Sequence, residues 1–118
     1  MSPSPARIRS TLAAAVDPPD DLRELRRFHK VLADVNRLRI VRRLADGPAT
    51  VTDLINHVGL SQPLVSWHLG KLRDVGLVAA RRTARETIHT LVPEAFARFA
   101  SHEAVVLGIG PDARPVLS

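Results

Sequence analysis

The sequence predicts a mostly α-helical domain with one small β-hairpin. From Asp20 onward, apolar residues recur at the spacing of one helix face in several successive segments. Two of these segments are joined by only three residues, and the connection opens with Gly59, which is typical of a helix-turn-helix. Two short extended runs with a turn-like connection follow this pair. Together these observations predict a winged helix-turn-helix fold, in which the hairpin is the wing.

The length and the charge of the chain limit its class. At 118 residues it fits one domain, which we expect to span residues 20–107. Residues 1–19 are expected to form a flexible extension or a dimerisation arm, and residues 108–118 a flexible tail. The 17 Lys and Arg residues outnumber the 12 Asp and Glu residues, and the formal net charge of +5 favours a polyanionic partner.

No segment resembles a membrane span or a secretory signal. No apolar run approaches the roughly 18 residues that are needed to cross a bilayer. The N-terminus lacks the basic and apolar regions of a signal peptide, and the chain contains no cysteine. We therefore expect a cytoplasmic protein with no membrane partner, no disulfide and no thiolate metal site.

The first two helices are predicted from apolar periodicity. The first is expected from Asp20 to about Asp34, with an apolar face made by Leu22, Leu25, Phe28 or His29, and Leu32. Asn36 is expected to cap the second helix. The side chains expected to face the core from this helix are those of Leu38, Val41, Leu44 and Ala45, while its Arg side chains are expected to point outward.

The third and fourth helices make up the predicted helix-turn-helix. The third begins at Thr50 or Thr52, and its apolar side chains are Val51, Leu54, Ile55 and Val58. Gly59 ends it, and Leu60 is expected to fill the corner between the two helices. The fourth is expected over residues 61–74, with Ser61 as its cap and Pro63 in a first turn whose amides lack helical partners.

The wing and a last helix complete the predicted domain. The wing is expected over residues 77–92, where the extended runs LVAARR and TIHTLV flank a polar TARE connection. Its tip would carry Arg81, Arg82 and Arg85. Pro93 begins the last helix, whose apolar face is made by Phe96, Phe99 or Ala100, and Val106.

The only tryptophan lies on an outward face of the fourth helix. At 3.6 residues per turn, Val65, Leu69 and Leu72 share one stripe, and Trp67 falls on the opposite side. A large apolar side chain in that place either contacts a binding partner or folds back against a neighbouring helix or the wing.

Three sequence blocks carry a family resemblance. LADVNRLRI, SQPLVSWHL and the GLV before the wing occur in this order. From about Leu22 to Val92 the chain thereby resembles the ArsR/SmtB family of bacterial winged-helix repressors. It departs from the family pattern at Asp34-Val35-Asn36, where Asp-Pro-Thr is usual, and at Trp67, where Arg, Gln or His is common.

The resemblance implies a homodimer that binds a palindromic double-stranded DNA operator and represses its own or a neighbouring operon. The dimer contacts would come from the first and last helices, over residues 22–34 and 94–106. The helix over residues 61–74 would enter the major groove, and the wing would contact the DNA backbone or the minor groove.

The residues expected to contact DNA on this basis lie in that helix and in the wing. They are Ser61, Gln62, Pro63, Ser66, Trp67, Lys71, Arg81, Arg82 and Arg85. Gln62 has the amide that pairs with adenine, and arginines at a hairpin tip suit phosphates. Alternatively, Ser61 serves only as a helix cap, and Lys71 or any one of the wing arginines is merely solvated.

Neither of the family's usual metal-ligand sets is present. The third helix offers only Asp53 and His57 where soft-metal sites have cysteine, and the last helix offers Glu94, His102 and Glu103 without the spacing of the other set. We therefore expect no metal and no cofactor, with a site across subunits at His102 and Glu103 as the alternative. His68, at the edge of the apolar stripe, is expected to be a hydrogen-bonded packing residue.

The sequence carries no signature of an enzyme. It has no glycine-rich phosphate loop, no nucleophile paired with histidine, and no paired carboxylates in a recognisable context. The alternative to a DNA-binding regulator is a winged-helix module for protein contact, anchored by Trp67. The basic wing favours DNA, because a protein-contact module has no need of arginines there. The sequence does not indicate an effector.

Overall fold

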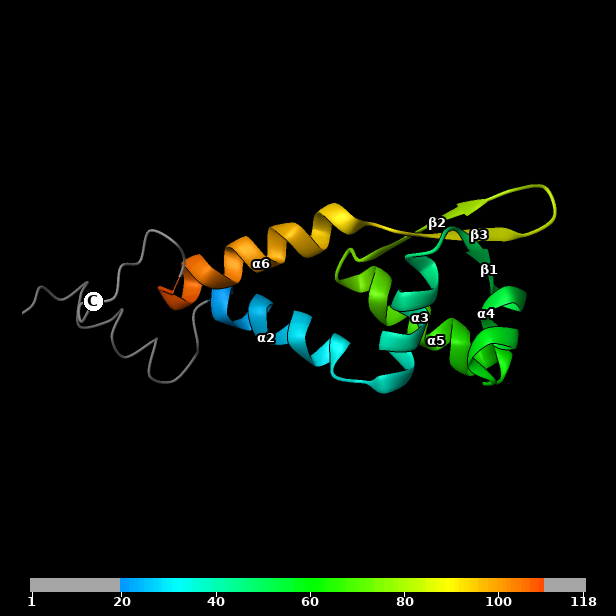
Figure 1. Ribbon diagram of the computed structural model, residues 1–118, viewed down its shortest axis with the longest axis horizontal. Helices are drawn as coiled ribbons and strands as arrows, with labels where there is room; N and C mark the ends of the chain where they lie inside the picture. Colours follow the sequence, from blue (N-terminus) through cyan, green and yellow to red (C-terminus); the bar gives the residue numbers. More distant parts are fainter. Residues whose placement is uncertain (1–19, 110–118) are drawn as a thin grey trace, which may run out of the picture.

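The computed structural model describes residues 20–109, and Figure 1 shows the order of their helices and strands. The elements are α2 (Asp20–Leu32), α3 (Val35–Leu44), β1 (Ala49–Thr50), α4 (Val51–Val58), α5 (Gln62–Asp74), β2 (Val78–Arg82), β3 (Thr87–Leu91) and α6 (Pro93–Leu107). The predicted fold class, mostly helical with a small hairpin wing, is confirmed. The predictions for residues 1–19 and for the tail beyond Ile109 lie outside the described residues. None of the described helices is long and apolar enough to cross a membrane.

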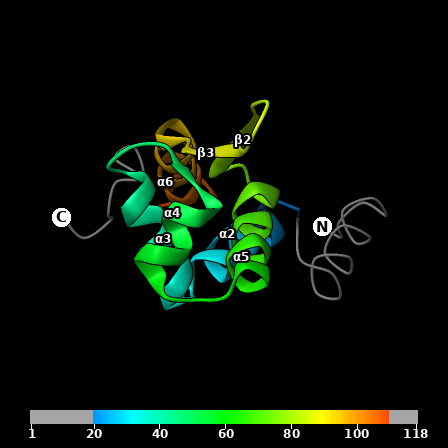
Figure 2. The ribbon, with the colours of Figure 1, turned by 90° about the vertical axis from the view of Figure 1, so that its right-hand side faces the viewer.

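The described elements form two regions along the long axis of the molecule. α2 and α6 lie side by side at one end, while α3, α4, α5 and the sheet lie at the other (Figure 1). After a turn of 90°, α5 and the β2–β3 hairpin are seen on the same side of the molecule (Figure 2). The fold therefore presents the second helix of the helix-turn-helix and the wing together.

One apolar core joins α3, α4, α5 and the sheet. Its largest fully buried side chains are Ile40, Leu54, Val65, Leu69, Leu72 and Leu77. Burial stabilises the fold by about 1.5–3 kcal/mol for each such side chain, and it holds both helices of the helix-turn-helix against α3. Towards the other end, the ring of Phe28 stacks on that of Phe99 with centroids 3.9 Å apart, which joins α2 to α6.

The buried face of α2 differs by part of a turn from the predicted one. Leu25 and Phe28 are buried as predicted, but Val31 completes the buried face and Leu22 is 39% exposed. Leu32 is only partly buried. The apolar residues of this helix are numerous enough to define two overlapping faces, and packing against α6 selects one of them.

The cap of α3 is Asp34, and the prediction of Asn36 is wrong. Asp34 has extended backbone angles of φ −141° and ψ 123°, and its carboxylate accepts a hydrogen bond from the amide of Arg37 at 3.1 Å. The helix therefore begins at Val35, and Asn36 lies inside its first turn. Both residue types are good caps, so the choice depends on which backbone adopts the extended conformation.

The inward face of α3 also differs from the predicted face. Arg37, Ile40 and Leu44 are its buried residues, whereas Leu38 is 48% exposed. Val41 packs against the core as predicted, but it is only partly buried. The expectation that every arginine of this helix points outward is thus wrong for Arg37, which is 8% exposed.

The guanidinium of Arg37 joins three helices. Its Nε donates to Nδ1 of His68 in α5 at 3.0 Å, and its Nη1 donates to the carbonyl oxygen of Val31 in α2 at 3.1 Å. Burial is the main cause that lowers the pKa of His68, the nearby charge of Arg37 lowers it further, and Asp34 opposes both. The neutral ring keeps the lone pair that Arg37 needs, so the prediction of His68 as a hydrogen-bonded packing residue is confirmed.

The helix-turn-helix follows the predicted boundaries. Thr50 caps α4, with its hydroxyl accepting from the amide of Asp53 at 3.1 Å and the Asp53 carboxylate accepting from the Thr50 amide at 3.0 Å. These hydrogen bonds lower the pKa of Asp53. Gly59 ends α4 in the left-handed conformation, with φ 74°, which a residue with a side chain rarely adopts.

The wing belongs to a sheet with one strand more than the sequence indicated. β1 pairs with β3, and β3 pairs with β2, so the order of the antiparallel sheet is β1-β3-β2. β1 has only two residues, which is too short for any period to be recognised. It pairs with the middle of the hairpin strand β3, because Ala49 lies opposite His89 and Thr50 opposite Ile88.

Replacing Asp34 with Ala is expected to lower the free energy of unfolding by about 1 kcal/mol, because the Arg37 amide loses its acceptor. The matched change Asn36→Ala is expected to be nearly neutral, since Asn36 lies within the helix, where Ala is the better helix former. Urea denaturation of both variants measures the difference. A larger loss for Asn36→Ala would contradict the assignment of the cap.

The stability of the domain is expected to fall as the pH is lowered from about 7 towards 5, because burial lowers the pKa values of both His68 and His89. The unfolded chain binds protons at an ordinary histidine pKa of about 6.5, whereas the folded chain does not bind them until a lower pH. This contribution to stability is complete above the unfolded-chain pKa of about 6.5. It is lost as the pH falls from there to the lower pKa of the folded chain. Thermal unfolding should show a shallower decline for His68→Gln, and a wild-type stability that rises on acidification would contradict this reasoning.

Candidate nucleic-acid interface

The first turn of α5 presents a group of accessible residues. Ser61, at the N-cap position with φ −68° and ψ 159°, makes no side-chain hydrogen bond to that turn. The alternative that Ser61 serves only as a helix cap is therefore correct about its position. However, its side chain does not make the hydrogen bond that a capping residue usually makes. Gln62, Pro63 and Ser66 are exposed as well, and their spacing places them on one side of the helix.

The opposite side of α5 is anchored in the core. Val65, Leu69 and Leu72 are 0% exposed, and His68 is 4% exposed. These positions share one helical stripe, so α5 cannot turn about its axis without bringing them to the surface. The direction in which the outward side chains point is therefore determined by the core.

Trp67 lies outward, as the helical spacing predicted, and 52% of its surface is exposed. It is not isolated, because the Arg37 guanidinium carbon lies 5.0 Å from the indole centroid and Lys71 Nζ lies 5.7 Å from it. The exposed half of the indole agrees with the prediction that Trp67 contacts a binding partner. Its position beside Arg37 of α3 agrees in part with the alternative that it packs on a neighbouring helix. Contact of Trp67 with DNA stays a prediction.

The wing carries its arginines on an ordered hairpin. β2 and β3 pair in register, with Arg81 opposite Ile88 and Arg82 opposite Thr87. The tip is closed by Thr83, whose amide and hydroxyl donate to the Glu86 carbonyl oxygen at 2.7 and 2.8 Å. The arginine side chains of the wing therefore start from a defined backbone.

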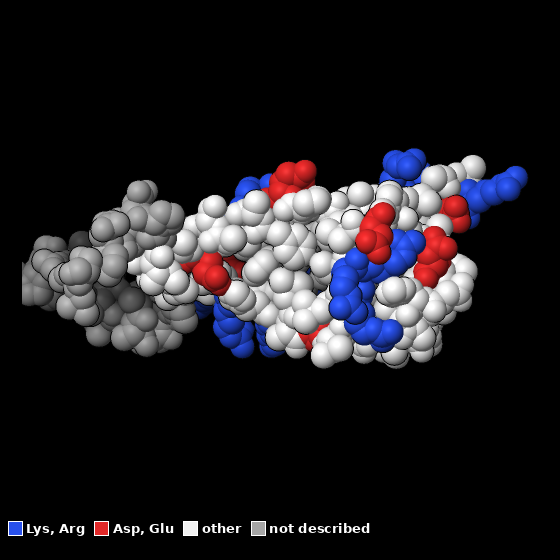
Figure 3. All heavy atoms as spheres, viewed as in Figure 1, with Lys and Arg blue, Asp and Glu red and all other residues white. Residues whose placement is uncertain are grey.

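The side chains of Arg81, Arg82 and Arg85 are exposed, and within residues 20–109 none of them has a hydrogen bond or an ion pair. Successive strand residues point to opposite faces, so Arg81 and Arg82 extend from the two faces of the hairpin. The outer end of the hairpin is correspondingly basic in the space-filling view (Figure 3). These cations are therefore accessible to phosphate groups.

A second group of cations has a structural role that the sequence did not reveal. Figure 3 shows a band of Lys and Arg atoms over α3. Arg39 donates to the carbonyl oxygens of Val58 and His57 at 3.1 and 3.3 Å, at the C-terminus of α4. Arg43 donates to the Gly47 carbonyl oxygen at 3.1 Å. Cations at a helix C-terminus satisfy its last carbonyl groups.

The candidate metal ligands do not gather in the described part of the chain. No group of three or more His, Cys, Asp or Glu side chains lies together within residues 20–109. Glu103 of α6 contacts the ring of His29 in α2 instead. Nε2 of His102 is buried without a hydrogen-bond partner in the described region.

Arg27 and Lys30 of α2 also lie near Trp67, where they line a hollow with it. The sequence did not indicate that they lie in this region. No periodic signal could have done so, because the contact joins residues that are far apart in the chain. Arg37 carried a weak signal, since its spacing to Ile40 and Leu44 places all three on one helix face.

Residues 34–80 match the family model of the arsR family of bacterial regulatory proteins. A probable mercury resistance operon repressor of Streptomyces lividans is 39% identical over 83 residues, which cover 70% of this chain and 66% of that protein. The regulator NmtR of Mycobacterium tuberculosis is 40% identical over 62 residues, which cover 52% of each chain. The chain thus spans about half to two thirds of the length of these curated relatives.

Solved structures agree with these matches. The crystal structure of Rv0081 of M. tuberculosis has a TM-score of 0.56 and 34% identity, covering 68% of this chain and 82% of that chain. A homodimeric winged helix-turn-helix DNA-binding domain, Mb0332 of Mycobacterium bovis, has a TM-score of 0.62 and 27% identity, with 90% of each chain covered. The winged helix-turn-helix, the matched family model and these relatives show that the chain belongs to the ArsR family of bacterial transcriptional regulators.

Proposed function

We propose that this chain is a sequence-specific DNA-binding transcriptional regulator that represses its own or a neighbouring operon. The observation that carries the proposal is the exposed first turn of α5 on the same side as a wing with three exposed arginines. An α-helix fits the major groove, and arginines on an adjacent hairpin reach the flanking phosphates or the minor groove. Such a regulator acts in the cytoplasm, where bacterial DNA lies.

The two surfaces have different tasks in this proposal. Gln62 reads base edges, since its amide both donates and accepts, and the hydroxyls of Ser61 and Ser66 reach phosphates or bases. Pro63 contributes an exposed apolar surface in the same turn. The wing arginines supply affinity that is largely independent of sequence.

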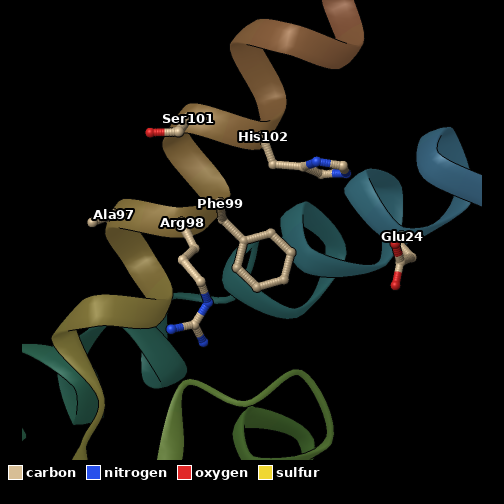
Figure 4. Close-up of a pocket in the computed structure, with 6 residues that line it drawn as sticks. All are labelled: Glu24, Ala97, Arg98, Phe99, Ser101 and His102. Atoms are coloured by element: carbon tan, nitrogen blue, oxygen red, sulfur yellow. The ribbon is translucent and has the colours of Figure 1, made fainter.

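The regulator acts as a dimer that is formed by α2 and α6. Several apolar side chains on these helices or just after them remain exposed in the single chain: Leu22 (39%), Val105 (77%), Leu107 (48%) and Ile109 (68%). A hollow of about 580 Å³ is lined by residues of both helices (Figure 4). Its lining includes Phe99, Arg98 and His102 of α6 and Glu24 of α2. A second copy would cover this surface, and the Mb0332 domain is itself described as homodimeric.

The other function classes have less support. The family is one of regulators, which favours DNA binding over both enzymatic activity and a protein-contact module. The names of two relatives refer to mercury and arsenical resistance. This chain contains no cysteine, and soft metals select thiolate ligands, so metal-independent DNA binding stays our prediction.

Replacing Arg81, Arg82 and Arg85 together with Ala is expected to weaken binding to every duplex and to reduce the slope of log affinity against log salt by up to about three per subunit. Gln62→Ala is expected instead to lose preference at one base position with little change in slope. Fluorescence anisotropy with a duplex from the gene's own upstream region, across a salt series, measures both. Arg42→Ala, an exposed arginine of α3, is the matched control, and an unchanged slope for the triple variant would exclude phosphate contact by the wing.

The wild-type chain is expected to sediment as a dimer at micromolar concentration. Val105→Glu should shift it towards the monomer, because a carboxylate in an apolar interface loses its hydration. Leu38→Glu introduces the same charge at another exposed apolar residue, in α3, and should leave the dimer intact. A strictly monomeric wild-type mass would contradict the proposed dimer, and dissociation by Leu38→Glu alone would place the interface elsewhere.

A further inference from the structure

A basic pocket lies between α2, α3 and α5, outside the residues proposed to read bases. It has a volume of about 360 Å³, which is within the range of small-molecule sites. Its charged lining consists of Arg27 and Lys30 of α2, Arg37 of α3, and Lys71 and Asp74 of α5. Trp67 and Val31 supply its apolar surface.

The charge of the basic pocket is unbalanced. Four cations line it against one carboxylate, that of Asp74. The Asp74 backbone is engaged as well, since its carbonyl oxygen accepts from Arg27 Nη2 at 3.4 Å. Like charges that converge on one hollow raise its potential, and an anion lowers the electrostatic energy of the group.

Arg37 makes one wall of the basic pocket rigid. Its hydrogen bonds to His68 and to the Val31 carbonyl oxygen use Nε and Nη1. Within the described residues, Nη2 has no protein acceptor. A guanidinium that is already held in place loses little side-chain entropy when it binds an anion.

Trp67 adds a flat apolar surface to this charge. Arg37 and Lys71 both lie within 6 Å of its indole centroid, at 5.0 and 5.7 Å. Half of the indole remains exposed, although this is the largest apolar side chain of the protein. A planar group stacked on the indole would cover it beside the cations.

We infer that the basic pocket binds a phosphate or carboxylate anion, held by Arg27, Lys30 and Lys71, with any planar part of the ligand against Trp67. The anion has two possible sources: a free aromatic phosphate or carboxylate, or a backbone phosphate of bound DNA. A free anion would occupy Trp67 and Lys71, which also belong to the proposed DNA-contacting helix, so it would alter operator binding. Only this consequence for DNA rests on the proposed function, whereas binding of the free anion does not.

The fluorescence of Trp67 tests the free-anion source without DNA, because this is the only tryptophan in the chain. Phenyl phosphate titrated into the full chain at constant ionic strength is expected to give a saturable change, and phenol, which has the ring without the charge, is expected to give none. Lys30→Gln should weaken the binding about tenfold, as the loss of one charge-assisted contact implies. Arg82→Gln, which removes a wing cation outside the basic pocket, should leave it unchanged.

A parallel measurement tests DNA as the source of the anion. If the basic pocket holds a backbone phosphate, phenyl phosphate has no saturable effect, and Lys30→Gln reduces the salt slope of duplex binding by about one per subunit. Arg42→Gln is the control for a general change of charge. The inference is overturned if Lys30→Gln alters neither titration, or if the control of a titration alters it as much as Lys30→Gln does. The control is Arg82→Gln for phenyl phosphate and Arg42→Gln for the duplex. DNA binding that persists in that case leaves the proposed regulator standing.

Discussion

The position of α5 depends on the buried guanidinium of Arg37. A charge in the interior is tolerated only when it is paired or hydrogen-bonded, and here its partners are a carbonyl oxygen of α2 and the neutral ring of His68 in α5. The amide of the same residue is the donor to the cap of α3 at Asp34. One residue thereby connects the start of α3, the end of α2 and the middle of α5. The apolar core then determines how α5 is rotated about its own axis.

The arginines of this chain have two separate roles, although they contribute equally to its net charge. Arg39 completes the hydrogen bonding of carbonyl groups at the end of α4, and Arg43 does the same in the turn that follows α3. The arginines of the wing are exposed on a short hairpin whose strand β3 also pairs with β1 and whose tip is closed by Thr83. The exposed positive charge of the wing is therefore separate from the arginines that maintain the fold.

The two flanks of α5 differ in chemistry. Gln62 and Ser66 form a polar flank near the first turn, while Trp67 and Lys71 form the flank that borders the basic pocket. Because α5 cannot rotate without exposing its core stripe, the two flanks keep a fixed orientation relative to each other. The base recognition proposed for one flank and the anion binding proposed for the other can therefore occur on a single helix without any rearrangement of its core.

The sequence by itself determined the order of the helices and of the two wing strands, the helix-turn-helix boundaries at Gly59 and Ser61, and the outward position of Trp67. These features follow from local backbone preference and from the 3.6-residue period, which act within a few residues. Only the tertiary structure decided that Arg37 is buried, that β1 joins the sheet, and which cations meet at Trp67. Each of those contacts joins residues distant in the chain, and a buried arginine is stable only where the fold brings distant acceptors to it.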